Sequence, residues 1–280
     1  NALDGDTLNG VAVTTGTVSI AVAPGATVPA GLTVDTATGN VSVDPGTPAG
    51  TYSFDYQICE LLNPANCAIA TETVTVTAAP IAAVDDTATG INGIDGAPSV
   101  LNVLDGDTLN GNPVDPSTVT ISVATGSTVP AGLDFDPTTG SVSVDPNTPA
   151  GTYTFDYTIC EILNPTNCST ATVTVTVDAA PIVATPDVAP PTNGADGGPG
   201  VINVLPNDTL GGDPVDPTTV TVTVTTPATP VDGGPVPTLN PATGDVDVPP
   251  GTPAGDYVIT YEICEQLNPS NCAIATETVT

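Results

Sequence analysis

Hydrophobic and polar residues alternate along long stretches of the chain. Between residues 152 and 160 the apolar positions are Tyr153, Phe155, Tyr157 and Ile159, each separated from the next by one polar residue. In the same way, threonines alternate with Val173, Val175 and Val177. A period of two places all apolar side chains on one face of a β-strand. The pattern therefore predicts strands with one buried and one solvated face, and no segment shows the 3.6-residue period of a helix.

Short runs of this kind, bounded by turn residues, recur between residues 99 and 177. The candidate strands are Ser99–Leu104, Thr118–Ala124, Leu133–Phe135, Ser141–Val144, Thr152–Cys160 and Thr170–Val177. The chain has 28 glycines and 31 prolines among 280 residues, which suits many strands joined by turns. We therefore predict an all-β fold in which each module is a β-sandwich of about seven strands.

The chain contains three copies of one module. The segment from Asn1 to Gly10 returns at residues 102–111 and, in a changed form, at residues 203–212. The period is about 100 residues, which is the size of a domain and too long for a solenoid repeat. We expect a tandem array with the first module at residues 1–78, the second at 79–179 and the third at 180–280.

The first module lacks the segment that precedes the other two. In the second module this segment corresponds to residues 79–101, and nothing equivalent stands before Asn1. Two interpretations are open. Either the chain is a window from a longer array, or a strand from another chain completes the first module by β-strand addition.

Each module contains two cysteines with seven residues between them. The pairs are Cys59/Cys67, Cys160/Cys168 and Cys264/Cys272, and each spacer contains the turn signal Asn-Pro. By parity both cysteines of a pair lie on the polar face of neighbouring strands, where a cross-strand disulfide is possible. A metal site or a redox dithiol is the other interpretation, but the chain has no histidine and no C-x-x-C motif. We predict three structural disulfides, each stabilising by roughly 2–3 kcal/mol, and a location outside a reducing cytosol.

The charge of the chain excludes several functions. It has 31 Asp and Glu residues and no Lys, Arg or His, for a net charge of −31. No side chain can neutralise phosphates, so nucleic-acid binding is excluded, as is electrostatic attachment to anionic lipid. There is no apolar run long enough for a membrane span. Ser-His-Asp, Cys-His and Schiff-base chemistry also lack their residues, so we expect no enzyme.

Several acidic residues near the starts of the second and third modules are candidates for calcium ligands, although Pro186 and Pro206 replace the equivalents of Asp85 and Asp105 in the third module. The candidates are Asp85, Asp86, Asp105, Asp107, Asp187 and Asp208. Calcium takes six to eight oxygen ligands, several of them carboxylates, and the four aspartates near the start of the second module would converge at its junction. The competing interpretation is that these aspartates cap their own turns and are otherwise solvated. No cofactor is required under that interpretation.

Several motifs carry a resemblance to bacterial surface proteins. The second module contains Val129-Pro-Ala-Gly-Leu133, Asp136-Pro-Thr-Thr-Gly140 and Gly151-Thr-Tyr-Thr-Phe155 in that order, which resembles Ig-like domains of large bacterial surface proteins. Val84-Asp-Asp-Thr87 with Val103-Leu-Asp-Gly-Asp-Thr108 is similar to cadherin-like repeats of tandem-repeat adhesins. The tail from Tyr157 onward resembles fibril-type repeats of Bacteroidota giant proteins. The resemblance implies Ig-like sandwiches in an extracellular stalk or filament.

Two functions follow from these observations. The first is structural: disulfide-linked spacer modules in an extracellular filament or adhesin stalk at the bacterial cell surface, with neighbouring modules or copies of the same protein as partners. The alternative is a set of calcium-dependent adhesive modules that bind glycans or a partner surface. Three similar copies favour spacing, although they also permit multivalent binding.

Overall fold

The computed structural model describes residues 1–280 and consists of strands and turns only. No helix is present that is long and apolar enough to cross a membrane. The chain forms two compact units. Unit 1 comprises Asn1–Val84, Gly106–Ser122 and Thr158–Thr170, and unit 2 comprises Asp85–Asp105, Val123–Tyr157 and Ala171–Thr280. The first repeat therefore lies in unit 1, the third in unit 2, and the second contributes to both.

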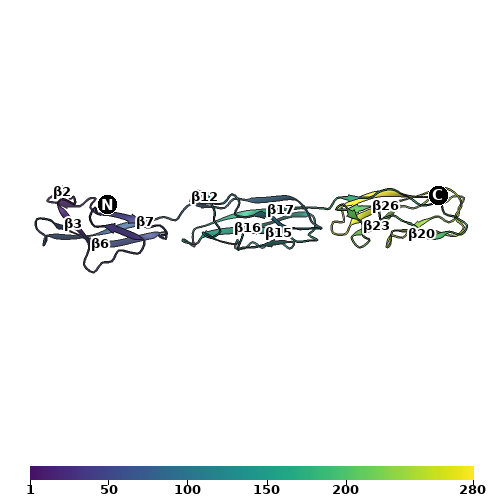
Figure 1. Ribbon diagram of the computed structural model, residues 1–280. Coiled ribbons are helices and arrows are strands. Elements are labelled where there is room, and N and C mark those ends of the chain that lie inside the picture. Colours follow the sequence, from purple (N-terminus) through teal and green to yellow (C-terminus); the bar gives the residue numbers. More distant parts are fainter. The chain divides into compact units, whose positions relative to one another are not determined.

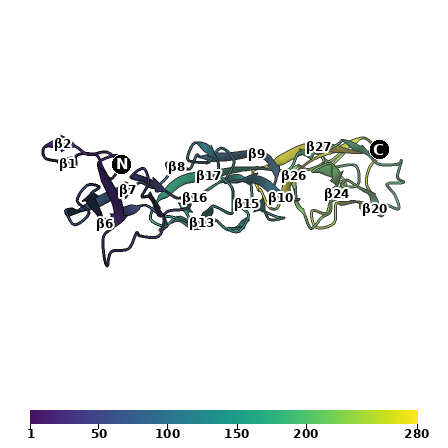
Figure 2. The same cartoon turned by 60° about the vertical axis from the view of Figure 1, so that its left-hand side comes forward.

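The third repeat is a sandwich of a four-stranded and a three-stranded sheet (Figures 1 and 2). The larger sheet has the order β19-β27-β26-β23, and the smaller has the order β20-β25-β24. A small third sheet, β18-β21-β22, lies at the start of the repeat. The bounds are β18 Ile182–Val183, β19 Asp187–Val188, β20 Gly198–Asn203, β21 Thr209–Leu210, β22 Asp213–Pro214, β23 Val220–Thr226, β24 Thr238–Leu239, β25 Asp245–Val248, β26 Tyr257–Glu265 and β27 Cys272–Val279.

The alternating pattern places the core of the third repeat between its two larger sheets. Along β26 every second residue is buried, from Tyr257 to Glu265, and the residues between them are more exposed. The smaller sheet contributes Val246 and Val248 to the same core. Aliphatic side chains dominate the cluster because the chain has few aromatic residues.

The second repeat has the same three sheets, and they contain the strands that the sequence predicts. The orders are β13-β16-β17-β9, β10-β15-β14 and β12-β11-β8. The bounds are β8 Ile81–Ala82, β9 Asp86–Asn92, β10 Ala97–Asn102, β11 Thr108–Leu109, β12 Asn112–Pro113, β13 Val119–Val123, β14 Leu133–Phe135, β15 Ser141–Val144, β16 Gly151–Glu161 and β17 Cys168–Asp178. The larger two sheets give seven strands, so the all-β tandem sandwich is the observed fold class.

The sequence does not predict β9, and it does not predict the two-residue strands β8, β11 and β12 either. β9 pairs in parallel with β17, with Val173 opposite Asp86 and a register shift between Val175 and Val177. The sequence of β9 is Asp-Thr-Ala-Thr-Gly-Ile-Asn, which has no apolar alternation. Its strand conformation depends on hydrogen bonds to a neighbour that lies far along the chain.

The first repeat lacks the strands that correspond to β9 and β10. Its sheets are β3-β6-β7, β4-β5 and β1-β2. The bounds are β1 Thr7–Leu8, β2 Val11–Ala12, β3 Val18–Val22, β4 Leu32–Asp35, β5 Asn40–Val43, β6 Gly50–Glu60 and β7 Cys67–Val76. No residue of β7 is buried, whereas β27 buries Ala275, Glu277 and Val279. The first repeat therefore presents β7 as an uncovered edge strand.

Each repeat contains one disulfide between the two strands of its last hairpin. The bonds are Cys59–Cys67, Cys160–Cys168 and Cys264–Cys272, and the chain has no free cysteine. Cys59 is directly opposite Cys67 in the antiparallel register, and Cys264 is directly opposite Cys272. The side chains lie on the face away from the core, as the parity of the flanking residues predicts.

The uncovered edge gives a testable prediction. Residues 79–101 joined directly before Asn1 should supply the missing strand and pair with β7. Amide exchange along β7 should then slow by at least about tenfold, because its outward N–H groups gain partners. Hydrogen exchange with NMR detection measures this, and the amides of β27 serve as the internal control. Unchanged exchange along β7 would show that the first repeat does not accept this segment.

Candidate functional site

In the second and third repeats a buried glutamate lies at the end of the disulfide-linked hairpin. Glu265 continues the inward face of β26 after Tyr261 and Ile263, so its carboxylate points away from solvent and is 1% exposed. Asn268 Nδ2 donates to Glu265 Oε1 at 2.8 Å, and Asn271 Nδ2 donates to Oε2 at 2.7 Å. Two neutral amide groups thus stabilise a buried charge that no side-chain cation can pair with.

The second repeat repeats this arrangement. Asn164 and Asn167 each donate from Nδ2 to Glu161 Oε2, at 2.9 Å and 2.8 Å. Both asparagines belong to the Asn-Pro-x-Asn spacer between the cysteines. The glutamate therefore fixes the orientation of both amides and leaves the Asn164 carbonyl oxygen free to accept.

In the second and third repeats the first asparagine of the spacer joins its repeat to the preceding one. In unit 1 the Ala49 N–H donates to Asn164 Oδ1 at 2.6 Å. In unit 2 the Ala150 N–H donates to Asn268 Oδ1 at the same distance. Ala49 and Ala150 occupy equivalent Thr-Pro-Ala-Gly turns of successive repeats. The same hydrogen bond therefore forms twice, once within each compact unit.

The linker segments bind to the same hairpins. Asn271 Nδ2 also donates to the Ala180 carbonyl at 2.7 Å, and Asn167 Nδ2 donates to the Ala79 carbonyl at 2.7 Å. After this contact Ile182 pairs with Leu210 in the β18-β21 ladder. The linker is thus held by a hydrogen bond at Ala180 and by the β18-β21 pairing that follows it.

A second polar cluster lies inside the third repeat. The hydroxyl of Tyr261 is 3.2 Å from Asp187 Oδ2, 3.2 Å from Asp208 Oδ2 and 3.2 Å from the Val204 carbonyl. The Thr185 N–H donates to Asp208 Oδ1 at 2.6 Å. One hydroxyl proton cannot satisfy all these acceptors. Burial raises the pKa of Asp208 to about 6 and also raises the pKa of Asp187, so the site favours protonated carboxyls.

Glu277 adds a third carboxylate beside this cluster. It lies directly opposite Asp187 in the parallel β19-β27 register and is 0% exposed. Neither carboxylate oxygen has a hydrogen-bond partner. The nearby Ala189 N–H donates to the Thr278 carbonyl at 2.8 Å. Burial, followed by the charge of Asp187, raises the pKa of Glu277 to about 7.

The candidate calcium ligands have different surroundings. In the second repeat Asp86 and Asp107 are buried and Asp105 is exposed. Asp107 Oδ1 accepts from the Val84 N–H, and Asp85 Oδ1 accepts from the Thr172 N–H, both at 2.8 Å. In the third repeat Asp187 and Asp208 both face the Tyr261 hydroxyl. Calcium binding by these residues stays a prediction.

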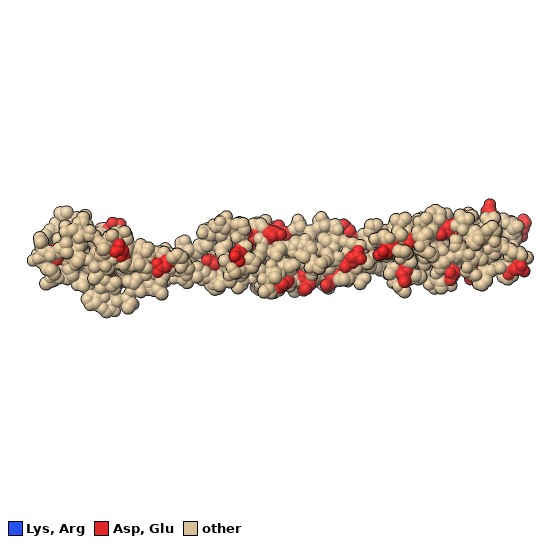
Figure 3. All heavy atoms as spheres, viewed as in Figure 1, with Lys and Arg blue, Asp and Glu red and all other residues tan.

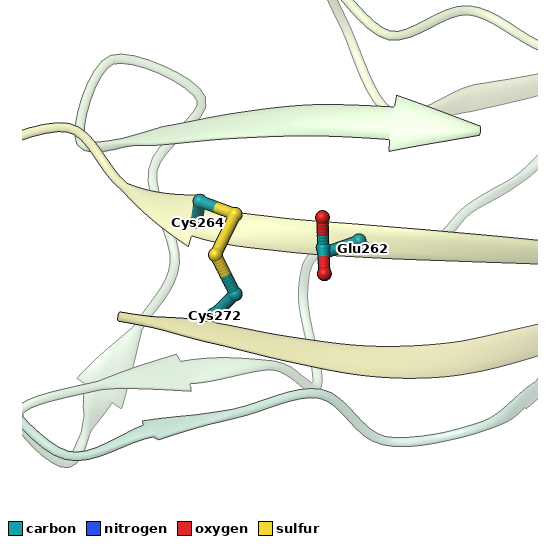
Figure 4. A group of neighbouring side chains, drawn as sticks. All are labelled: Glu262, Cys264 and Cys272. Atoms are coloured by element: carbon teal, nitrogen blue, oxygen red, sulfur yellow. A yellow bond between two sulfur atoms is a disulfide. The ribbon is translucent and has the colours of Figure 1, made fainter. Parts of the chain in front are cut away.

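The carboxylates around Tyr261 do not form a compact set of ligands. Within the third repeat the three potential ligand atoms that lie within 4.8 Å of one another belong to Glu262, Cys264 and Cys272, and Asp187, Asp208 and Glu277 do not form such a group. Figure 4 shows Glu262 beside the Cys264–Cys272 disulfide on the outer face. Because the disulfide consumes both thiolates, this trio is not a thiolate metal site.

Acidic side chains are spread over the surface. On the face shown in Figure 3 they occur on all three repeats without a basic neighbour, since the sequence contains no Lys or Arg. None of the nine aromatic side chains is fully exposed, and seven of them are buried. The surface therefore offers neither an anion-binding patch nor an exposed aromatic platform.

Comparison with known proteins gives a likeness in solved structures only. No family model and no curated protein matches the chain. Mouse cadherin-23 EC22-24 is 14% identical, with 94% of this chain and 84% of that chain covered and a TM-score of 0.36. The protocadherin GammaB4 extracellular domain is 10% identical (94% and 44% covered, TM-score 0.35), and human CDH23 EC21-23 is 14% identical (94% and 88% covered, TM-score 0.33). These neighbours are tandem cadherin repeats. Because their TM-scores are below 0.5, the fold class is assigned from the sheets and strand orders of this chain and not from this likeness.

The sequence did not predict two features of the site. The Asn-Pro-x-Asn spacer is predicted only as a turn. In every repeat its two asparagines stand three and six residues after the glutamate that follows the first cysteine, and this recurrence was a usable signal. Glu277 gives a weaker signal, because the equivalent residues are Glu72 in the first repeat and Val173 in the second. That exchange between charged and apolar residues indicates a buried position.

The buried carboxylates predict how the stability of the third repeat depends on pH. Asp208 and Glu277 have folded-state pKa values raised to about 6 and about 7. The stability they contribute is complete below about pH 4 and is lost as pH rises through these values. Glu277→Val should therefore stabilise the third repeat at pH 8 by at least about 1 kcal/mol and should reduce the fall in stability between pH 5 and pH 8.

Urea unfolding followed by the methyl signals of Ile259 and Ile263 measures this in the full chain. Glu262→Gln removes one charge from the outward face of the neighbouring strand β26, where Glu262 is partly exposed, and is the matched control for general charge repulsion. Equal pH profiles for Glu277→Val and Glu262→Gln would show that Glu277 has no special role.

Proposed function

We propose that the chain is a structural array of disulfide-linked sandwich repeats that acts as a spacer in an extracellular filament or adhesin stalk at the bacterial cell surface. The observation that carries the proposal is the repeated bond between an asparagine of one repeat and an alanine N–H of the preceding one. A spacer needs each repeat to hold its neighbour in a fixed orientation, and a repeated joint supplies that orientation.

The chemistry of the joint supports a restrained linker. Asn268 Oδ1 accepts from Ala150, while its Nδ2 group is held by the buried Glu265 carboxylate. The amide therefore cannot rotate without loss of a charge-assisted hydrogen bond. The Ala180 carbonyl is bound by the same hairpin, so both the covalent linker and the non-covalent contact restrict bending.

Three disulfides support an extracellular location, because such bonds persist outside reducing compartments. The resemblance of the repeats to those of bacterial adhesins supports a bacterial surface. The absence of Lys and Arg suits this setting as well, since trypsin-like proteases find no cleavage site. Neighbouring repeats and copies of the same protein are the partners that we propose.

The surface supports spacing in preference to sugar binding or catalysis. Sugar sites commonly use exposed aromatic rings, but no aromatic side chain of this chain is fully exposed. Only carboxylate-pair chemistry is compatible with the composition, and the buried carboxyls around Tyr261 are closed off by the core. We therefore propose a non-enzymatic role.

Small-angle X-ray scattering of the full chain tests the spacer. If each repeat adds roughly 30–40 Å, the maximum dimension should be about 100 Å, and the radius of gyration should be well above the roughly 19 Å of a compact globule of this length. The double variant Asn164→Ala/Asn268→Ala should bend more freely and give a broader distance distribution. Asn63→Ala removes the equivalent residue where this chain has no preceding repeat and is the matched control. A compact wild-type particle would contradict the spacer role.

Calcium binding inside the third repeat is the second candidate. The supporting observation is Glu277, whose buried carboxylate has no hydrogen-bond partner and lies opposite Asp187. Together with Asp208 these residues offer the hard oxygen ligands that calcium takes. Because their ligand atoms are not gathered within 4.8 Å, binding requires the carboxylates to move together.

Thermal unfolding in EDTA and in millimolar calcium tests this candidate. Calcium should raise the Tm of the third repeat, since a ligand that binds only the folded state stabilises it. The rise should be smaller in Glu277→Val. A Tm that does not differ between EDTA and calcium would contradict calcium binding and would leave proton uptake as the way in which the cluster is neutralised.

A further inference from the structure

The asparagine of each joint lies in a short loop that leaves its sheet at a disulfide. In the third repeat the pairing of β26 with β27 ends where Cys264 lies opposite Cys272, and these two residues form the disulfide. The loop between them contains Asn268, whose Oδ1 accepts from the Ala150 N–H. Strand pairs at the end of a ladder open at a lower free-energy cost than pairs in its middle. The disulfide therefore closes the pair at which this end of the hairpin would begin to open.

The groups that orient the joint asparagine are direct chain neighbours of the two cysteines. Glu265 follows Cys264, and Asn271 precedes Cys272. The Glu265 N–H donates to the Asn271 carbonyl at 3.0 Å, and Asn271 Nδ2 donates to Glu265 Oε2 at 2.7 Å. Glu265 Oε1 in turn accepts from Asn268 Nδ2 at 2.8 Å. The position of the joint amide therefore depends on the separation of the two strand ends, which the disulfide fixes.

The second repeat has the same loop with the same contacts. The Glu161 N–H donates to the Asn167 carbonyl at 3.0 Å, and the Nδ2 groups of Asn164 and Asn167 donate to the Glu161 carboxylate. Asn164 Oδ1 then accepts from the Ala49 N–H, and the disulfide of this loop is Cys160–Cys168. Each joint thus has its own disulfide, so one joint can be changed while the other serves as the reference.

The disulfides lie where an external thiol reaches them without unfolding of the repeat. Cys168 and Cys272 are exposed, and the bond between Cys264 and Cys272 lies on the outer face of the sheet beside Glu262 (Figure 4). The hydrophobic core lies on the opposite face of β26, where Ile263 is fully buried. Cleavage of the disulfide therefore removes no contact from the core.

We propose that the disulfide of each joint is a positioning element, so that an external dithiol loosens the joint while the sandwich stays folded. This inference deepens the proposed function, because it rests on the joint described there and adds the oxidation state of the cysteines as its regulation. The repeats are held in a fixed orientation only when the cysteines are oxidised.

Cleavage of the bond is a thiol–disulfide exchange. One thiolate of the dithiol attacks Cys272 Sγ, so the bond between the two cysteine sulfurs breaks and Cys264 leaves as a thiolate. The second thiolate of the reagent then displaces Cys272 from the mixed disulfide. The dithiol loses two electrons and two protons and becomes a disulfide, and the two cysteines take up these electrons and protons as thiols. The products no longer hold the ends of β26 and β27 together.

Amide hydrogen exchange of the full chain, detected by NMR, tests the proposal. In Cys264→Ser/Cys272→Ser the Ala150 N–H should exchange at least about tenfold faster than in the oxidised wild type, because Asn268 no longer holds a fixed position. The Ala49 N–H should not change in this variant. The matching double serine variant of the second repeat should give the reverse pattern.

Reduction of the wild type by dithiothreitol is the second measurement. It should accelerate exchange at both Ala49 and Ala150, because it opens both loops at once. The amide of Ile259, in the middle of the sheet, should stay protected in the reduced chain and in the serine variant, which shows that the sandwich is intact.

Three results would overturn the proposal. The first is equal exchange of Ala150 in the oxidised wild type and in Cys264→Ser/Cys272→Ser. The second is an acceleration of the same factor at Ile259, because the disulfide then stabilises only the repeat as a whole. These two results leave the spacer untouched. The third is an Ala150 amide that is unprotected in the oxidised wild type, and in that case the joint of the proposed function fails as well.

Discussion

Every carboxylate that this protein buries must be stabilised without a side-chain cation. The chain has no Lys, Arg or His, so the only internal donors are backbone N–H groups, amides and hydroxyls. Transfer of an ionised carboxylate out of water is costly unless such donors are present in good geometry. The structure supplies them unevenly: Glu265 receives two amides, Asp208 receives a backbone N–H and the Tyr261 hydroxyl, and Glu277 receives no hydrogen bond.

This unevenness divides the buried acids into two kinds. Glu265 and Glu161 are held as hydrogen-bonded acceptors at the hairpin ends, where they order the asparagines. Asp208 and Glu277 have fewer hydrogen-bond donors or none, and their raised pKa values mean that proton uptake, or a cation, relieves the cost of their burial. The second repeat avoids one of these charges altogether, because Val173 occupies the position of Glu277. Equivalent positions therefore tolerate either an apolar side chain or an acid that changes its protonation.

The same constraint connects the interior of a repeat to its neighbour. The glutamate at the hairpin end binds the Nδ2 group of Asn268, and this leaves Oδ1 directed at the alanine N–H of the preceding repeat. Removal of the glutamate charge would thus disturb a contact that the glutamate does not make itself. A neutral bond of this kind also suits a chain with a uniform negative charge, because salt bridges between repeats are impossible and repulsion acts at every distance within the screening length.

Local pattern determined a large part of this fold, and non-local pairing determined the rest. The alternation in residues 152–160 and 170–177 predicts strands that β16 and β17 contain, and the parity of Cys160 and Cys168 places both on the outer face. The sequence does not predict β9, since it adopts strand conformation only through parallel pairing with β17. Nor does it predict that Asn268 reaches Ala150, because that bond joins residues 118 positions apart. Periodicity reports which face of a strand is buried, but which carbonyl meets which N–H between repeats depends on the packing of the whole chain.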